Sequence, residues 1–234
     1  MSAVVCPHAA IMYSGPVAAH SYLHLSRLKD PELIVVVAPN HNGIGSGVST
    51  YSSGEWETPL GRMKVDSAMA EAFAKEAGIV EFDPEAHRIE HSLEVQLPFL
   101  QAIYGNGVPF LPISISFQDY DTTKTLGDAL AKVTDGKKVL FVASSDLTHY
   151  EPASQAKEKD AALLKRVEKL DIPGFYETLG ARMITSCGFG AIAVVMQVCR
   201  SRGCRSGVLL KYATSGDVTG DDSSVVGYAS VRFQ

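Results

Sequence analysis

The feature that most constrains the fold is a set of short apolar runs, rich in β-branched residues, that recur along the chain. Most are apolar at consecutive rather than alternate positions, which is typical of parallel strands covered on both faces. A more alternating run closes the chain and favours a strand at an edge or in antiparallel orientation. The predicted strands are Ala3–Cys6, Leu33–Ala38, Phe110–Ile115, Val139–Ser144, Val208–Ala213 and Val225–Phe233.

Segments with helical periodicity separate these strands. Leu163, Val167 and Leu170, for example, would form one apolar helix face. A hairpin is predicted over Gly54–Asp66, with Asp66 capping the next helix. This alternation, without repeats or linkers, predicts one α/β domain over residues 1–234, with helices around a central, mostly parallel sheet. The predicted helices are Val17–Leu28, Ser67–Ala77, Glu94–Tyr104, Thr122–Val133, Ala153–Leu170, Pro173–Leu179 and Phe189–Arg202.

Charge and hydropathy exclude several classes of protein. The 21 Lys and Arg against 26 Asp and Glu give a net charge of −5, and they are scattered, which argues against nucleic-acid binding. The one basic cluster, Arg200–Arg205, is interpreted as a solvated helix C-terminus. No run approaches the roughly 18 apolar residues of a membrane span. With no signal sequence before the first strand, we expect a cytoplasmic protein.

The four cysteines show no CxxC pair and no zinc-finger spacing, so we expect free, mostly buried thiols in a reducing compartment. Cys199 and Cys204 are close enough in sequence to form a disulfide, and the sequence leaves their state open. The four are Cys6, Cys187, Cys199 and Cys204.

Polar side chains follow four of the predicted strands where each one ends. His8 follows the first strand, His41 the second, Asp146 and His149 the fourth, and Asp217 the fifth. The carboxyl ends of parallel strands lie along one edge, where α/β proteins bind ligands, so we expect these residues to converge. Asp217 also lies in a loop rich in Gly, Asp and Thr, where an Asx turn is the alternative interpretation.

A further histidine, His91, lies at the start of a helical pattern that should face the same edge. Glu94, about one turn later, is expected to orient its ring. Two imidazoles and one carboxylate suit Fe(II) or catalytic Zn and leave coordination positions open. We therefore predict His41, His91 and Asp217 as metal ligands.

The remaining polar residues of this edge are predicted to move protons. The ordinary pKa of histidine lies near neutrality, so His149 suits a general base or acid. Asp146, three residues away, is expected to hold or tune His149. His8 is predicted to line the pocket as a further proton carrier.

Two other functions remain open at this point. A metal-free hydrolase would use Ser144, Ser145 or Cys187 as its nucleophile with the pair His149 and Asp146, although no GxSxG elbow is present. A binding protein would keep the pocket without turnover. The sequence discriminates poorly between the metal enzyme and the binding protein.

Six segments resemble the signature segments of Memo family proteins, in the same order, from Cys6 to Ala229. This resemblance implies a fold similar to class III (LigB-type) non-haem iron extradiol dioxygenases, with one α/β domain around a central sheet. The segments are PHAAIMYSG, APNHNG, WETPLG, EHSLEVQLPFL, SSDLTHY and TSGDVTGDDSSVVGYA.

The resemblance also implies a metal pocket. The family's metal-associated histidines fall on His41 and His91, and its Asp/His pair falls on Asp146 and His149. The last ligand is a Glu in the dioxygenases and a Cys in the human family member, and the corresponding loop here carries Asp217. His8 matches the family's PHAG motif, with Ala at the position of the Gly.

The human member is described as a signalling mediator that binds phosphotyrosine-containing peptides and as an iron and copper binder. Microbial members are often named after AMMECR-type and radical SAM proteins, which are therefore expected partners. The resemblance implies Fe(II), with Zn or Cu as alternatives, and a dioxygenase that acts on a small catechol-like substrate with His149 moving protons. The alternative is a non-catalytic metal- or peptide-binding adaptor with a vestigial pocket.

Overall fold

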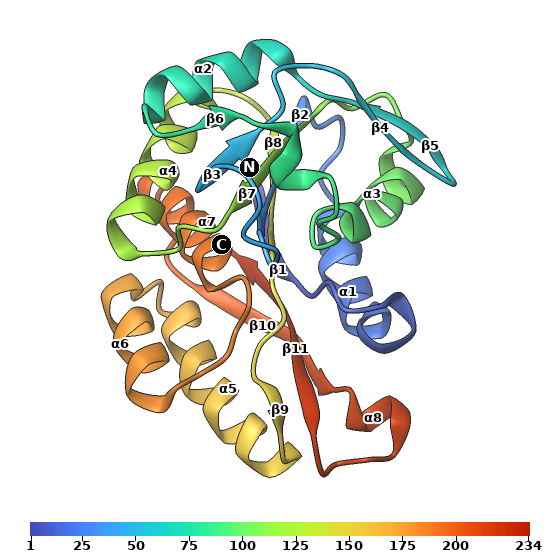
Figure 1. The fold of residues 1–234 in the computed structure, drawn as a ribbon, viewed down its shortest axis with the longest axis vertical. Helices are drawn as coiled ribbons and strands as arrows, with labels where there is room; N and C mark the ends of the chain where they lie inside the picture. Colours follow the sequence, from blue (N-terminus) through green and yellow to red (C-terminus); the bar gives the residue numbers. More distant parts are fainter.

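The computed structural model describes residues 1–234 and contains one large sheet and a separate hairpin (Figure 1). The hairpin pairs β4 (Glu55–Thr58) with β5 (Gly61–Lys64), as predicted. The strands of the large sheet are β1 (Ser2–Cys6), β2 (Leu33–Pro39), β3 (Val48–Thr50), β6 (Glu81–Phe82), β7 (Phe110–Ile115), β8 (Val139–Ser144), β9 (His149–Glu151), β10 (Gly207–Thr214) and β11 (Val225–Phe233).

The nine strands of the large sheet have the order β10-β11-β1-β8-β2-β7-β3-β6, and β9 pairs with β11. The central strands β1, β8, β2 and β7 are parallel, which confirms the predicted core of the sheet. The closing strand β11 was predicted to lie at an edge or to be antiparallel. It is antiparallel to β1, but it lies inside the sheet. It is internal because β10 pairs with its other side over most of its length.

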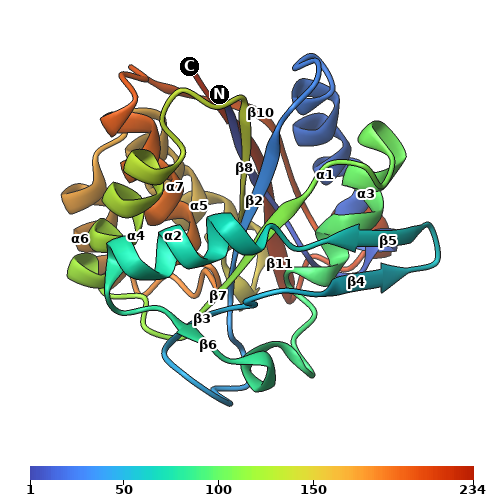
Figure 2. The same ribbon diagram turned by 90° about the horizontal axis from the view of Figure 1, so that it is seen from above.

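Helices cover both faces of this sheet (Figure 2). The first helix begins at Ile11, before the predicted start, and continues through Pro16. A proline at this position costs one backbone hydrogen bond, while the buried Val17, Ala18 and Tyr22 hold the helix against the sheet. The helices are α1 (Ile11–Leu25), α2 (Ser67–Ala77), α3 (Leu97–Tyr104), α4 (Tyr120–Val133), α5 (Ala153–Glu168), α6 (Ile172–Arg182), α7 (Phe189–Ser201) and α8 (Gly216–Thr219), with 3-10 turns η1 (Pro84–His87) and η2 (Glu94–Gln96).

Strand β2 shows why the apolar runs of this chain are continuous. Leu33, Val35 and Val37 belong to the core cluster that includes α2, α4 and α7. Ile34 and Val36 point the other way and join the cluster that includes α1 and α3. Helices exclude water from both faces of the sheet, so residues of β2 that point to either face are apolar. None of the helices combines the length and apolarity required to cross a membrane.

Candidate metal centre

Three adjacent parallel strands bring the candidate residues together. β8 lies between β1 and β2, so the residues that follow these three strands emerge side by side at one edge of the sheet. A pocket of about 440 Å³ opens there. Its lining residues are His8, Ala9, His41, His91, Asp146, His149, Tyr150, Thr185, Cys187 and Val226.

Three imidazoles converge in this pocket. One ring nitrogen of each of His8, His41 and His91 lies within 4.8 Å of the others. Their ring centroids are 5.1 to 5.5 Å apart. His8 is buried at the floor of the pocket, whereas the other two rings are exposed. The structure thus brings together the two histidines predicted as ligands and adds His8, which the sequence suggested only as a proton carrier.

Glu90 orients the exposed pair. Its Oε1 lies 2.8 Å from His41 Nδ1, and its oxygens also accept the backbone N–H groups of His41 and Ser92 at 2.6 and 2.9 Å. Burial opposes ionisation of this carboxyl, but these hydrogen bonds outweigh it and lower the pKa of Glu90 to about 2. An ionised carboxylate only accepts hydrogen bonds, so His41 carries its proton on Nδ1 and leaves Nε2 free.

The same Glu90 oxygen lies 3.4 Å from His91 Nδ1, so one carboxylate serves both exposed rings. The prediction that Glu94 orients His91 was therefore wrong. Glu94 begins η2 and lines a different cavity with Tyr51 and Trp56. The orienting residue is the immediate neighbour of His91, because hydrogen bonds from Ser92 to the Pro39 carbonyl and from the His41 N–H to Glu90 hold this segment against the end of β2.

His8 is oriented by a buried serine. The Ser144 hydroxyl donates to the Ser92 carbonyl at 2.6 Å and accepts from Gln96 Nε2 at 2.8 Å. Because the hydroxyl has only one proton and donates it to Ser92, it must accept the hydrogen bond from His8 Nδ1, at 2.9 Å. The unprotonated atom of His8 is then Nε2. Burial lowers the pKa of His8 to about 4, which keeps the ring neutral near pH 7.

His8 also belongs to a second set of possible metal ligands, together with Asp146 and Cys187. A carboxylate oxygen of Asp146 and the Cys187 sulfur lie within 4.8 Å of each other and of a His8 nitrogen. Cys187 Sγ is 3.2 Å from His8 Nε2, and Asp146 Oδ2 is 4.0 Å from it. From the sequence, Cys187 was expected to be a free thiol or the nucleophile of a hydrolase, since its turn before α7 gives no metal-ligand spacing.

His149 lines the pocket but is held by other residues than predicted. Its Nδ1 lies 2.8 Å from the Thr185 carbonyl, so Nδ1 donates and Nε2 is free. Asp146 does not hold it: its Oδ1 accepts the backbone N–H groups of His8 and Ala9 at 2.8 and 3.3 Å. The two residues diverge because the chain leaves β8 and places His149 in β9, paired with Val226 of β11.

Asp217 lies outside both donor groups. Its Oδ2 accepts from the backbone N–H and the hydroxyl of Thr214 at 2.7 and 3.1 Å, so it stabilises its own loop, although not through an Asx turn, in which it would accept from the residue two positions later. β10, which precedes it, is separated from β1 by β11. Neighbouring strands are about 4.8 Å apart, so this extra strand keeps the end of β10 away from the histidines.

The contacts of the hydrolase candidates argue against that alternative. Ser144 and Ser145 are fully buried, and their hydroxyls donate to backbone carbonyls. Burial raises the pKa of Cys187, and the histidine beside it, His8, has a lowered pKa. The pair is therefore neutral, whereas a nucleophilic cysteine requires a thiolate.

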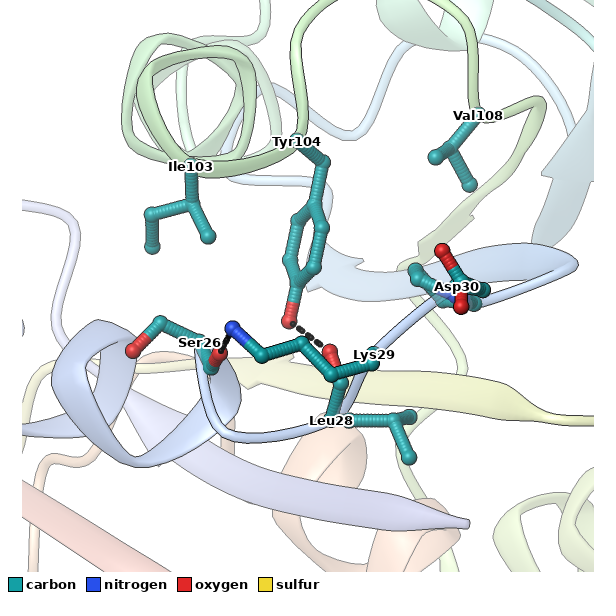
Figure 3. Close-up of a pocket in the computed structure, with 8 residues that line it drawn as sticks. Ser26, Leu28, Lys29, Asp30, Ile103, Tyr104 and Val108 are labelled. Carbon is teal, nitrogen blue, oxygen red and sulfur yellow. Dashed lines mark hydrogen bonds between the residues drawn. The ribbon is translucent and has the colours of Figure 1, made fainter.

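A cavity of about 590 Å³ lies near the amino end of β2 (Figure 3). The Tyr104 hydroxyl lies across it and donates to the Leu25 carbonyl, with the Leu28 carbonyl at 3.4 Å as a second, more distant acceptor. Its charged lining residues are Lys29 and Asp30, and it contains no His or Cys. A set with one carboxylate cannot hold a transition metal, so the histidine pocket is the candidate site.

The donor set of the histidine pocket fits a borderline divalent metal. His8 and His41 have an unprotonated Nε2 in the pocket and an Nδ1 proton directed into the protein, which is how metal-binding histidines are oriented. Imidazole suits Fe, Zn and Cu alike, and three protein donors leave coordination positions open. The chemistry of the donors supports a metal without selecting one.

Comparisons with known proteins agree with this fold. Residues 1–232 match the family model described as "Memo-like protein". The chain is 43% identical to a MEMO1 family protein of Methanopyrus kandleri, over 99% of this chain and 82% of that one. It is 44% identical to a MEMO1 family protein of Nitrosopumilus maritimus, over 98% and 83%. A crystal structure of an uncharacterized protein from Escherichia coli K12 is similar over 99% of both chains, with a TM-score of 0.67 and 18% identity.

Proposed function

Because the chain belongs to the Memo-like protein family, we propose that it binds one divalent transition metal through His8, His41 and His91. The observation that carries this proposal is the orientation of the rings. Ser144 and Glu90 accept hydrogen bonds from Nδ1 of His8 and His41, so Nε2 of each ring carries the lone pair that would bind an ion, and at His8 the ion would displace the Cys187 thiol. Asp146 and Cys187 stand beside His8 as further donors.

We propose Fe(II) as the metal and a small aromatic, catechol-like molecule as the substrate. Bound iron would supply Lewis acidity and a one-electron redox couple for oxygen chemistry. The pocket volume of about 440 Å³ is of the size that holds a small ligand. His149, with Nδ1 held by Thr185 and Nε2 free, would accept the proton of a substrate hydroxyl.

Anaerobic iron titration followed by elemental analysis tests the metal site. The wild type should bind about one Fe(II) per chain, and His8→Ala, His41→Ala and His91→Ala should each lose this binding. His20→Ala is the matched control, because this histidine lies on α1 and is absent from the pocket lining. Unchanged stoichiometry in the three pocket variants would overturn the proposed ligands.

Oxygen uptake with Fe(II) and a panel of catechols tests the chemistry. The wild type should consume oxygen above the buffer control, and His149→Ala should lose this activity while it retains iron. The alternative is the non-catalytic adaptor, which is favoured by Tyr150, a residue of the pocket lining whose side chain is strongly exposed at 78%. Intact iron binding without oxygen uptake for any catechol would support the adaptor.

A further inference from the structure

Two cysteines, Cys199 and Cys204, lie at the C-terminal end of α7, whereas the histidine pocket lies beside the start of this helix. Gly203, with φ of +79°, ends the helix. The backbone N–H of Cys204 donates to the Cys199 carbonyl at 2.9 Å, and that of Gly203 donates to the Arg200 carbonyl at 3.0 Å. This is the Schellman pattern, which frequently brings the side chains at these two positions together, and Cys204 packs against the core cluster that contains Cys199. Here both side chains are thiols.

The two thiols differ in their access to solvent. Cys199 is completely buried in the core cluster, and Cys204 is half-buried and packs against the same cluster. Cys204 also lines a cavity of about 400 Å³. A reagent in this cavity would therefore reach Cys204 first, with Cys199 directly behind it.

The cavity has a cationic wall. Lys169, Arg200 and Arg205 line it, and none of them forms an ion pair in the structure. The single carboxylate in the lining, Asp171, is paired with Arg166 at 2.8 Å. The wall thus presents unpaired positive charge beside the more accessible thiol.

The pKa values of the two thiols also differ, and the more accessible Cys204 is the more acidic. A hydrogen bond from the Cys199 thiol lowers the pKa of Cys204 to about 7, against the opposing effect of burial. Burial raises the pKa of Cys199 well above its ordinary value. Near neutral pH, Cys204 is therefore the nucleophile of the pair and Cys199 remains a thiol.

We propose that Cys204 and Cys199 form a thiol–disulfide exchange site for small disulfides that carry carboxylates. The Cys204 thiolate attacks one sulfur of the disulfide, forms a mixed disulfide and releases one thiolate. Cys199 then attacks the Cys204 sulfur, and its proton passes to the second thiolate as that group leaves as a thiol. The protein pair is oxidised to one disulfide, and the small disulfide is reduced to two thiols.

This site is distinct from the histidine pocket. Cys204 lies just before β10 begins, whereas the histidine pocket lies beyond the carboxyl ends of β1 and β2. β10 has the same direction as β1, because both are antiparallel to β11. The two sites therefore lie at opposite edges of the sheet.

Intact-mass spectrometry of the full-length protein with oxidised glutathione tests the proposal. The wild type should lose two hydrogens, and peptide mapping should join Cys199 to Cys204. Cys199→Ser should accumulate one glutathionyl group on Cys204, and Cys204→Ser should form neither product. Cys6→Ser, a change at a buried cysteine in β1, should behave as the wild type.

The charge of the probe tests the role of the cationic wall. Oxidised glutathione should react severalfold faster than cystamine, a disulfide with cationic ends, and Arg200→Gln with Arg205→Gln should reduce this preference. Equal rates for both probes would overturn the selectivity for carboxylates. A wild-type chain in which Cys204 stays unmodified would overturn the site itself, and this result does not depend on any variant folding.

Discussion

Glu90 holds His41 at two points: Oε1 lies 2.8 Å from the ring Nδ1, and Oε2 accepts the backbone N–H at 2.6 Å. One buried carboxylate therefore determines both the ring orientation and the path of the loop after β2. Its oxygens also contact Ser92 and His91, so the exposed half of the candidate metal site depends on this side chain.

Glu90→Gln should weaken metal binding about 10–100-fold, because the neutral amide no longer holds the Nδ1 proton of His41 as a carboxylate does and no longer places a negative charge beside His91. A chelator competition titration measures this change. Glu94→Gln is the matched control, since Glu94 belongs to the same segment but lines another cavity. Equal affinities in the two variants would show that Glu90 does not position the ligands.

His8→Ala and Asp217→Ala should differ sharply. The first removes the buried nitrogen at the floor of the pocket and should abolish stoichiometric iron binding. The second removes a carboxylate that accepts from Thr214, so iron binding should persist while the loop after β10 loses two hydrogen bonds. Iron content after gel filtration distinguishes them. Loss of iron from the Asp217 variant would restore the ligand predicted from the sequence.

Acid should destabilise the fold partly through His87. This side chain is 6% exposed, its Nε2 lies 2.9 Å from the Ser49 hydroxyl, and burial lowers its pKa to about 4. As pH falls from about 6.5 towards 4, the unfolded chain binds a proton that the folded protein does not. Stability is therefore complete above pH 7 and falls by up to about 3 kcal/mol by pH 4.

Urea unfolding of metal-free protein at several pH values measures this contribution of His87. The free energy of unfolding of His87→Asn should fall less between pH 7 and pH 5 than that of the wild type. His8 and other groups titrate in both proteins, so only the difference between them reports on His87. An equal fall of the unfolding free energy with pH in both proteins would show that His87 does not contribute.

Gly127→Ala should destabilise the packing of α4 on α7. A Cβ at this position would lie 2.5 Å from Gln197 Cβ and 2.9 Å from the Val194 carbonyl oxygen, so the helices must separate. We expect a loss of about 1–3 kcal/mol by chemical denaturation. Gly180→Ala in α6, with nothing within 4 Å, is the control and should be neutral or stabilise by up to about 1 kcal/mol.

The sequence predicted most elements of the fold because their cause is local. Continuous apolar runs such as Leu33–Ala38 follow from burial on both faces, and Asp66 caps α2 by accepting from the backbone N–H of Met69. Both signals involve residues that are close in the chain. The predicted helix after Pro16 began too late, because tertiary contacts outweighed the local effect of a proline.

The sequence by itself determined that His8, His41 and Asp146 end strands at the edge of an α/β sheet. Only the tertiary structure decided which of these residues meet, because strand order depends on pairing between distant segments. That order puts β8 between β1 and β2 and puts β11 between β1 and β10, which brings His8 into the pocket and keeps Asp217 outside it. The orienting role of Glu90 likewise depends on a contact across 49 residues, which no local spacing encodes.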